Sequence, residues 1–195
     1  MGFSEPFEIF GNWFAEAKDS EPTLANAMSI ATATKAGVPS TRMVLLKGWD
    51  ENGFVFYTNL ESRKASELGD NSNVALLFHW KSLDRQVRIV GTVAPVSDAE
   101  ADAYFASRDR GSQIGAWASA QSSRMDGRFD LEKAVAKYTA KFHVGSVPRP
   151  PHWSGFRVKP NGFEFWRAMP FRLHERRVFT LNDEGADWAT DLLYP

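Results

Sequence analysis

Cysteine is absent from the 195-residue sequence, and its absence excludes several kinds of chemistry. Disulfides, thiolate nucleophiles and cysteine-ligated zinc sites all require that residue, and a chain without it fits a reducing compartment. Long apolar runs are absent too, since none approaches the roughly 20 residues of a membrane-spanning helix. The N-terminus carries Glu5, Pro6 and Glu8 in place of the basic and then apolar order of a signal peptide. We therefore expect a cytoplasmic protein that does not enter a membrane.

A charge excess of either sign is also missing. Lysine and arginine together number 23 and aspartate and glutamate 24, which gives a formal net charge of −1. Such a chain has no general attraction for nucleic acid, so any anion site must be local. The 4 histidines show no metal-ligand spacing, and neither G-x-S-x-G nor a glycine-rich phosphate loop occurs. We expect no metal, no serine hydrolysis and no P-loop or Rossmann nucleotide site.

The sequence does contain a succession of short strand-like segments. Its length suits one domain, over residues 1–195. The helical spacing of Phe7, Phe10 and Phe14 predicts a first helix over 7–18. Further helices are predicted at 62–68, 97–108 and 131–142, the first two capped by serine. Strands are predicted at 27–34, 41–47, 54–58, 74–80, 86–96, 155–159, 162–166 and 172–181.

Closely spaced strands with few helices between them favour a mainly β fold with flanking α-helices, because parallel βαβ units would require strict alternation. The early strands fit a meander in which 41–47 pairs with 54–58 across a turn at 50–53. We therefore expect a β-barrel with helical decoration.

Two segments carry cationic side chains at positions that suit an anion. The segment 62–64, Ser-Arg-Lys, begins a predicted helix, where free amide groups and the helix dipole already attract negative charge. Tyr104 and Arg108 lie four residues apart on one predicted helix face, with Ser112 just beyond. The alternatives are an ordinary capped surface helix and an arginine that snorkels beside a half-buried tyrosine.

A third segment places Arg172, His174 and Arg176 at alternate positions of the predicted strand 172–181, hence on one face. A solvent-facing edge strand, on which charges prevent aggregation, explains this periodicity equally well. The neighbouring Phe171 and Trp166 favour a partly apolar site.

Several short motifs together resemble one known family. They are RMVLLK at 42–47, FYTN at 56–59, SRK at 62–64, RQVR at 85–88, SQIGAW at 112–117, VPRPP at 147–151, EFW at 164–166 and RLH at 172–174. In this order and spacing, over about residues 27–178, they resemble the pyridoxamine/pyridoxine 5′-phosphate oxidase family.

The resemblance implies a homodimer with an FMN-binding split β-barrel of Greek-key type, in which the flavin lies at the subunit interface. The FMN contacts that it implies are Arg42, Met43, Val44, Leu45, Leu46, Lys47, Tyr57, Thr58, Arg63, Lys64, Gln86, Gln121, Ser122, Trp166 and Arg176. The residues that it implies for the substrate phosphate are Lys47, Tyr104, Arg108 and Ser112. Arg172 and His174 would flank the pyridine ring as the catalytic residues.

The implied reaction oxidises pyridoxamine or pyridoxine 5′-phosphate to pyridoxal 5′-phosphate by hydride transfer to FMN, and O2 reoxidises the flavin to give H2O2. Arg167-Ala168, Glu175 and Leu192 depart from the usual Gln-Gly, aspartate and arginine of the family, and most of the family's N-terminal arm is expected to be missing. Two alternatives stay open: an oxidase of the same fold for a phenazine-type substrate, and a flavin or pyridoxal phosphate carrier without turnover.

Overall fold

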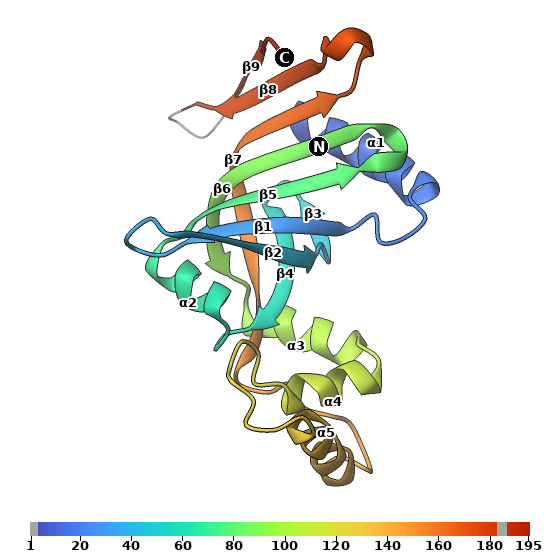
Figure 1. Cartoon of the computed structure of the whole chain (residues 1–195), viewed down its shortest axis with the longest axis vertical. Coiled ribbons are helices and arrows are strands. Elements are labelled where there is room, and N and C mark those ends of the chain that lie inside the picture. The colour runs from blue at the N-terminus through green and yellow to red at the C-terminus, as the bar shows by residue number, and fades with distance from the viewer. Residues whose placement is uncertain (1–3, 183–186) are drawn as a thin grey trace.

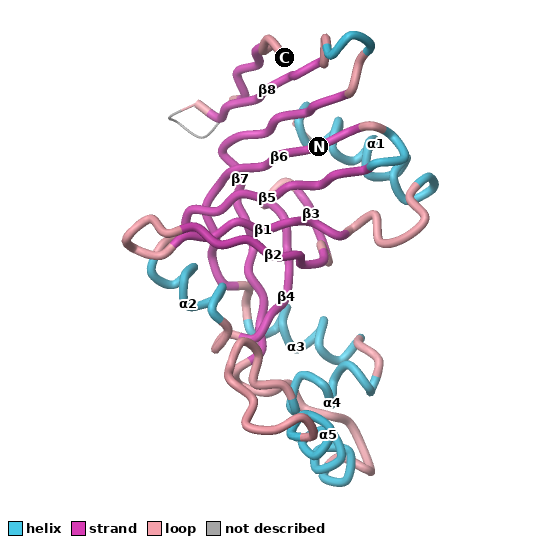
Figure 2. The backbone as a smooth tube through the Cα atoms, in the orientation of Figure 1, coloured by secondary structure: helices cyan, strands magenta, loops and turns pink. Residues whose placement is uncertain are grey.

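The computed structural model describes residues 4–182 and 187–195, and its centre is one antiparallel sheet that curls into a half-barrel (Figures 1 and 2). The strands lie in the order β2-β1-β5-β6-β7-β4-β3, and β8 joins β7 to β9. Their bounds are β1 (Ala27–Ala33), β2 (Pro39–Leu45), β3 (Gly48–Asp50), β4 (Gly53–Asn59), β5 (Asn73–Trp80), β6 (Arg85–Pro95), β7 (Trp153–Arg167), β8 (Glu175–Leu181) and β9 (Trp188–Leu192). The expected mainly β fold is confirmed; the expectation of a single domain stays a prediction.

Five α-helices flank the sheet in the described part of the chain. They are α1 (Glu5–Ser20), α2 (Arg63–Asp70), α3 (Asp98–Ser107), α4 (Arg110–Ala118) and α5 (Asp130–Lys141), and the 3-10 turns are η1 (Lys81–Leu83) and η2 (Pro170–Arg172). Within residues 4–182 and 187–195, no helix has the length and apolar character needed to cross a membrane.

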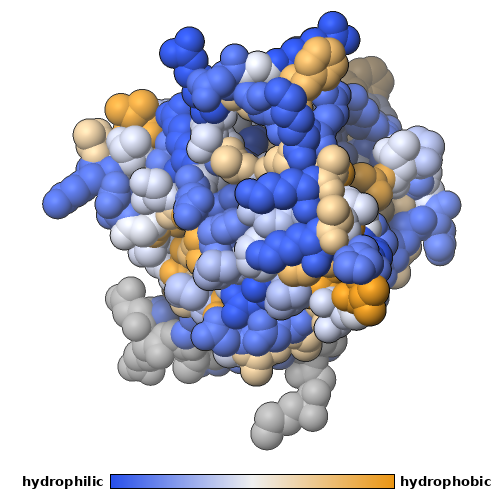
Figure 3. All heavy atoms as spheres, turned by 90° about the horizontal axis from the view of Figure 1, so that it is seen from below, coloured by the Kyte–Doolittle hydropathy of each residue, from blue (hydrophilic) through white to orange (hydrophobic). Residues whose placement is uncertain are grey.

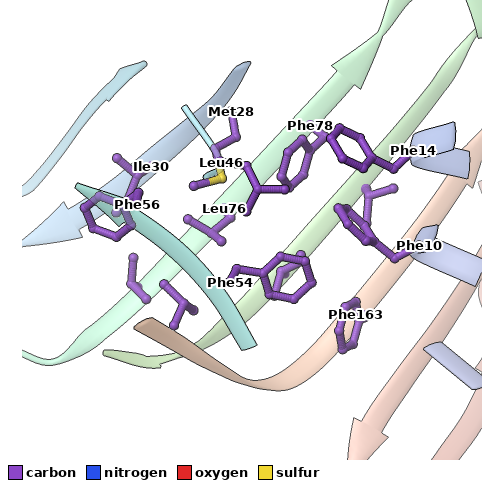
Figure 4. Packing of buried hydrophobic residues seen from close by; sticks show 14 of the residues in the cluster. Phe10, Phe14, Met28, Ile30, Leu46, Phe54, Phe56, Leu76, Phe78 and Phe163 are labelled. Atoms are coloured by element: carbon purple, nitrogen blue, oxygen red, sulfur yellow. The ribbon is translucent and has the colours of Figure 1, made fainter. Parts of the chain in front are cut away.

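Helix α1 packs its apolar stripe against one face of the sheet, as its spacing predicts. Glu5 and Glu8 lie in its first turn, where negative charge complements the helix dipole. The ring centroid of Phe10 lies 4.8 Å from that of Phe54 and 5.2 Å from that of Phe78 (Figure 4). Burial of such large aromatic side chains, each of which removes a large apolar surface from water, anchors α1 to the half-barrel.

The predicted meander is wrong, because β4 pairs with β3 and β7 and not with β2. The short strand β3 was missed; it turns the chain away from β2 before β4 begins. At the start of β4, Gly53 has φ +122, and a Cβ atom there would lie 1.9 Å from the carbonyl oxygen of Val158 in β7. Only glycine permits this approach, so β4 reaches a partner that is about a hundred residues away in the sequence.

The strands predicted at 155–159 and 162–166 are one long strand, β7. It pairs with β6 along its length, with β4 near its start and with β8 near its end. The register with β6 shifts between Val90 and Gly91, and a Cβ atom on Gly91 would lie 2.1 Å from the carbonyl oxygen of Lys159. A bulge of this kind increases the local twist, which helps the sheet to curl.

The predicted strand 172–181 is wrong in its first part, since β8 begins only at Glu175. Pro170 opens the turn η2, in which Phe171 and Arg172 have φ angles of 59 and 62, in the left-handed region. Arg172, His174 and Arg176 therefore do not alternate along one strand, and the argument that they share a strand face fails.

The elements separate along the long axis of the molecule (Figure 1). Helices α3, α4 and α5 gather at one end, whereas β8, β9 and the turn η2 lie at the other. Figure 3 looks onto the helical end, where hydrophilic residues predominate and apolar ones are scattered. This separation decides which of the predicted site residues can meet within one protomer.

Candidate functional site

A cleft of about 890 Å³ opens between the sheet and helices α2, α3 and α4. Most residues proposed from the sequence for FMN and for the substrate phosphate line it together. These are Arg42, Met43, Val44, Leu45, Lys47, Tyr57, Thr58, Arg63, Lys64, Tyr104, Arg108, Ser112, Gln121 and Ser122. The lining residues that the sequence-based site lacked are Asn59, Asp109, Gly115, Ala116, Ser119 and Trp153.

Leu46 does not line this cleft, and its role in flavin binding stays a prediction. It interrupts the run of cleft residues from Arg42 to Lys47, and its side chain is buried in the core.

The N-terminus of α2 supplies the first cationic part of the cleft. Ser62 caps the helix by accepting a hydrogen bond from the amide of Ala65 at 3.4 Å, as its position predicts. The ammonium of Lys64 is buried and donates to Thr58 Oγ1 at 2.8 Å and to Gln121 Oε1 at 2.7 Å. Burial, and then the nearby Arg42 charge, lowers the pKa of Lys64 to about 8. An anion at this helix end would raise the pKa of Lys64 again, because a nearby negative charge favours the ammonium form.

A buried carboxylate joins two arginines in the same part of the cleft. Glu67 Oε1 accepts from Arg63 Nε at 2.8 Å, and Glu67 Oε2 accepts from Arg42 Nη2 at 3.2 Å. Glu67 Oε2 also accepts from the hydroxyls of Ser40, at 2.5 Å, and Thr32. Hydrogen bonds from Ser40 and Thr32, then those from the arginines, hold the pKa of Glu67 at about 2 in spite of its burial. The sequence reasoning missed Glu67, although its place four residues after Arg63 was a usable signal.

The other part of the cleft combines an aromatic wall with a second cation. The rings of Tyr57 and Tyr104 stack with centroids 4.0 Å apart, and Trp153 stacks on Tyr57 at 5.2 Å. The guanidinium of Arg108 lies 4.8 Å from the Trp153 ring centroid. Burial raises the pKa of Tyr57 to about 12, so its hydroxyl stays protonated and neutral. This wall suits a flat, partly apolar ligand.

Arg108 is the residue of this cleft with the clearest capacity to bind an anion. Its Nη1 atom is buried and has no hydrogen-bond partner among the described residues. Desolvation, opposed by Tyr104 and Asp109, lowers the pKa of Arg108. Because an unpaired buried donor is costly, an anion that accepts from Arg108 would relieve the cost.

Helix α4, which the sequence reasoning missed, brings Ser112 to this end of the cleft. Asp109 caps α4 by accepting from the amide of Ser112 at 2.8 Å. Hydrogen bonds from the side chain of Ser112 and then from its amide lower the pKa of Asp109. Lys47 approaches from the sheet side, with Nζ 5.9 Å from the centroid of Tyr104. The four residues predicted for a substrate phosphate thus lie around one end of the cleft.

The remaining predicted residues form a second group outside this cleft. Gln86 of β6, Trp166 of β7 and Arg176 of β8 pair side by side across the sheet. The ring of His174 lies 4.7 Å from that of Trp166, and Arg176 Nε donates to Glu164 Oε1 at 2.8 Å. His174 and Arg176 line a separate groove of about 1020 Å³ beside α1 and β9. One protomer therefore does not bring this group to the cleft.

Sequence families match both halves of the chain. The family described as pyridoxamine 5′-phosphate oxidase matches residues 14–143, and the C-terminal dimerisation region of pyridoxine 5′-phosphate oxidase matches residues 153–195. A pyridoxine/pyridoxamine 5′-phosphate oxidase of Maricaulis maris is 60% identical over 191 residues, which cover 98% of this chain and 86% of that protein. The protein of the same name from Brucella canis is 58% identical over 192 residues, covering 98% of this chain and 95% of that protein.

Two solved structures share the fold. PhzG from Burkholderia lata, in complex with tetrahydrophenazine-1-carboxylic acid, superposes with a TM-score of 0.92 at 32% identity, over 98% of this chain and 93% of that one. An FMN-binding protein of Nostoc punctiforme, related to pyridoxamine 5′-phosphate oxidase, has a TM-score of 0.79 at 14% identity over 100% of both chains. The second likeness concerns the fold alone.

Proposed function

This chain belongs to the pyridoxamine 5′-phosphate oxidase family, and from that premise we propose that it oxidises pyridoxamine or pyridoxine 5′-phosphate to pyridoxal 5′-phosphate, with FMN as cofactor and O2 as acceptor. The observation that carries the proposal is one cleft with two cationic ends, each suited to one phosphate group. The working enzyme is a cytoplasmic homodimer.

The end of the cleft at α2 fits the phosphate of FMN. Arg63 at the helix N-terminus offers charge-assisted donors, and Lys64 and Arg42, whose terminal nitrogens donate to protein acceptors, add positive charge beside it. Thr58 and Gln121 hold Lys64 in place. Bound FMN would supply the redox chemistry, by accepting a hydride from C4′ of the substrate and passing the electrons to O2, which becomes H2O2.

The other end of the cleft fits the phosphate of the substrate. Lys47, Tyr104, Arg108 and Ser112 surround it, and the unpaired Nη1 of Arg108 is the donor that such a phosphate would satisfy. Because these groups fix the phosphate, they also fix how far the pyridine ring reaches along the cleft. The residues thereby contribute proximity and orientation, which is most of what a protein adds to a cofactor's reaction.

The active site is completed by a second copy of the chain. Arg172 ends the turn η2 and His174 directly precedes β8. In Figure 1, β8 lies at the end of the long axis opposite α4. A homodimer in which this turn of one protomer covers the cleft of its partner would bring both groups to one ligand. The description of residues 153–195 as a dimerisation region supports this arrangement. Gln86, Trp166 and Arg176, which lie in register near His174, would then contact the flavin from the partner side.

His174 and Arg172 act on the substrate ring. The amide of Met169 donates to His174 Nδ1 at 3.2 Å, so a neutral His174 carries its proton on Nε2. Nε2–H can donate to the substituent at C4′ or to the ring hydroxyl, while Arg172 supplies a fixed positive charge. Both residues thus orient and polarise the substrate while C4′ is held over the flavin.

A phenazine-type oxidase is the second candidate, because PhzG shares the fold at a TM-score of 0.92. The identities of 60% and 58% to pyridoxine/pyridoxamine 5′-phosphate oxidases favour the first function. The donors around Arg108 also exceed what a single ring carboxylate needs, whereas a phosphate accepts hydrogen bonds from several directions.

The test is aerobic turnover of FMN-loaded protein with pyridoxamine 5′-phosphate and, separately, pyridoxine 5′-phosphate. We expect pyridoxal 5′-phosphate, followed by its absorbance, together with one H2O2 for each molecule of product from either substrate. The amine is oxidised to an imine, which water hydrolyses, so pyridoxamine 5′-phosphate should also release one ammonia. Unphosphorylated pyridoxine is the control and should react far more slowly. Protein that binds FMN but forms no product from either substrate would contradict the proposal.

A further inference from the structure

We infer that Glu67 is a positioning residue of the flavin phosphate site, which links Arg63 to Arg42 of β2 and so holds Arg63 in the orientation that binds the phosphate. The inference rests on the proposed function in one respect, namely that FMN occupies the α2 end of the cleft. Nothing in the family resemblance marks this residue, and Glu67 does not itself line the cleft.

The two carboxylate oxygens of Glu67 have different partners. Among the described residues, Oε1 accepts from Arg63 Nε alone, whereas Oε2 accepts from Arg42 and from the hydroxyls of Thr32 and Ser40. One buried side chain on α2 therefore links an arginine of its own helix to an arginine of β2. Both arginines line the cleft.

The hydrogen bond to Glu67 leaves the two terminal nitrogens of Arg63 available to a ligand. Its Nε is held by Glu67, and its terminal nitrogens have no protein acceptor within the described part of the chain. The Arg63 side chain is 62% exposed, so without Glu67 it would sample many rotamers. A guanidinium held at Nε presents its terminal nitrogens as a fork that matches two phosphate oxygens.

Charge in this cluster also matches the ligand. Arg42, Arg63 and Lys64 carry three positive charges, and ionised Glu67 removes one. The resulting charge of about +2 equals that of a phosphate monoester dianion in magnitude. Glu67 thus keeps the cations from repelling one another before the flavin binds, and leaves enough charge to hold it.

Glu67→Ala and Glu67→Gln test the inference through two binding constants. The apoprotein is titrated with FMN and with riboflavin, which lacks the phosphate, and quenching of flavin fluorescence gives each Kd. We expect Glu67→Ala to weaken FMN binding about tenfold while the riboflavin Kd changes by less than about twofold. Glu67→Gln should recover most of the loss, because its amide oxygen can still accept from Arg63 Nε.

The exposed Glu61→Gln serves as the matched control, since it removes a nearby charge without touching either arginine; its Kd for FMN should not rise. Three results would overturn the inference. The first is a ratio of the Kd for FMN to the Kd for riboflavin that is unchanged in Glu67→Ala. The second is a lower Kd for FMN in Glu67→Gln than in the unsubstituted protein. The third is a Glu67→Ala variant with a lowered Tm that binds both flavins equally less tightly. Failure of the proposed function looks different, because the unsubstituted protein would then bind FMN no better than riboflavin.

Discussion

The imidazole of His174 packs against the indole of Trp166, with ring centroids 4.7 Å apart and ring planes at 42°. Trp166 lies within β7, in register with Gln86 on one side and Arg176 on the other. His174 follows the turn η2 and is outside any strand, so this contact and the hydrogen bond from Met169 fix its ring. The group is therefore preorganised before any ligand or second protomer arrives.

Arg172→Ala should cripple turnover and leave FMN bound. Arg172 supplies charge to the substrate ring, and loss of one orienting group can cost about a hundredfold in rate. The measurement is kcat and KM for pyridoxamine 5′-phosphate, together with the flavin content of the purified protein. Arg177→Ala in β8 is the control, because Arg177 is ion-paired with Glu5 and is not among the residues proposed to contact flavin or substrate. Normal turnover by Arg172→Ala would refute the role of Arg172.

Arg108→Met should weaken substrate binding and stabilise the fold. A charge-assisted hydrogen bond contributes about 1.5–3 kcal/mol, so KM for the phosphorylated substrate should rise roughly tenfold or more. Tm should rise, because the substitution removes the unpaired buried Nη1 and keeps apolar contact with Trp153. Steady-state kinetics and thermal unfolding check both effects, with FMN affinity as the internal control. An unchanged KM would show that Arg108 binds no phosphate.

FMN affinity should fall above about pH 8 because of Lys64. Burial lowers the pKa of Lys64 to about 8, whereas a bound phosphate dianion favours the ammonium form and raises it. From about pH 7 to pH 8 the ammonium and the phosphate dianion are both largely present already, so affinity is nearly flat. Above about pH 8, binding must take up a proton, so affinity falls by up to about tenfold per pH unit. Titration of the apoprotein with FMN across this range measures the effect.

Lys64→Met is the matched variant for that pH dependence. It should bind FMN more weakly at neutral pH and lose the decline above pH 8, since no lysine then titrates in the site. Riboflavin should show little pH dependence with either protein. A decline that persists unchanged in Lys64→Met would assign the titration to another group.

The sequence predicts well those features that depend on neighbours in the chain. The stripe of Phe7, Phe10 and Phe14 marks α1, and Ser62 and Ser97 cap the helices that they precede. Helical periodicity and capping are local, so a single sequence carries them. The cationic site at the start of α2 follows from the same information.

Other features depend on distant contacts, and the sequence reasoning failed there. The pairing of β4 with β7 is specified by close backbone approach at Gly53, which no local pattern records. The backbone at Phe171 and Arg172 turns left-handed where strand periodicity predicts extension. Glu67 was missed because its role depends on Arg42, which lies on another element. The division of the site into two groups appears only when the chain is folded.

Subunit complementation tests the central claim, that each active site is built from two protomers. Arg108→Met lacks a phosphate-binding residue of the cleft, and Arg172→Ala lacks a substrate-binding residue of the turn η2. Each variant alone should therefore have little activity at substrate concentrations below KM. When the two variants are co-expressed, each with its own affinity tag, they should form heterodimers in which one of the two sites is intact. About half of the dimers in a random mixture are heterodimers, so the mixture should have about a quarter of wild-type activity. Arg108→Met mixed with Lys47→Met, two cleft variants, should stay inactive. The predicted result is that activity returns when Arg108→Met is paired with Arg172→Ala and not when it is paired with Lys47→Met. A verified heterodimer of Arg108→Met and Arg172→Ala without activity would contradict the account.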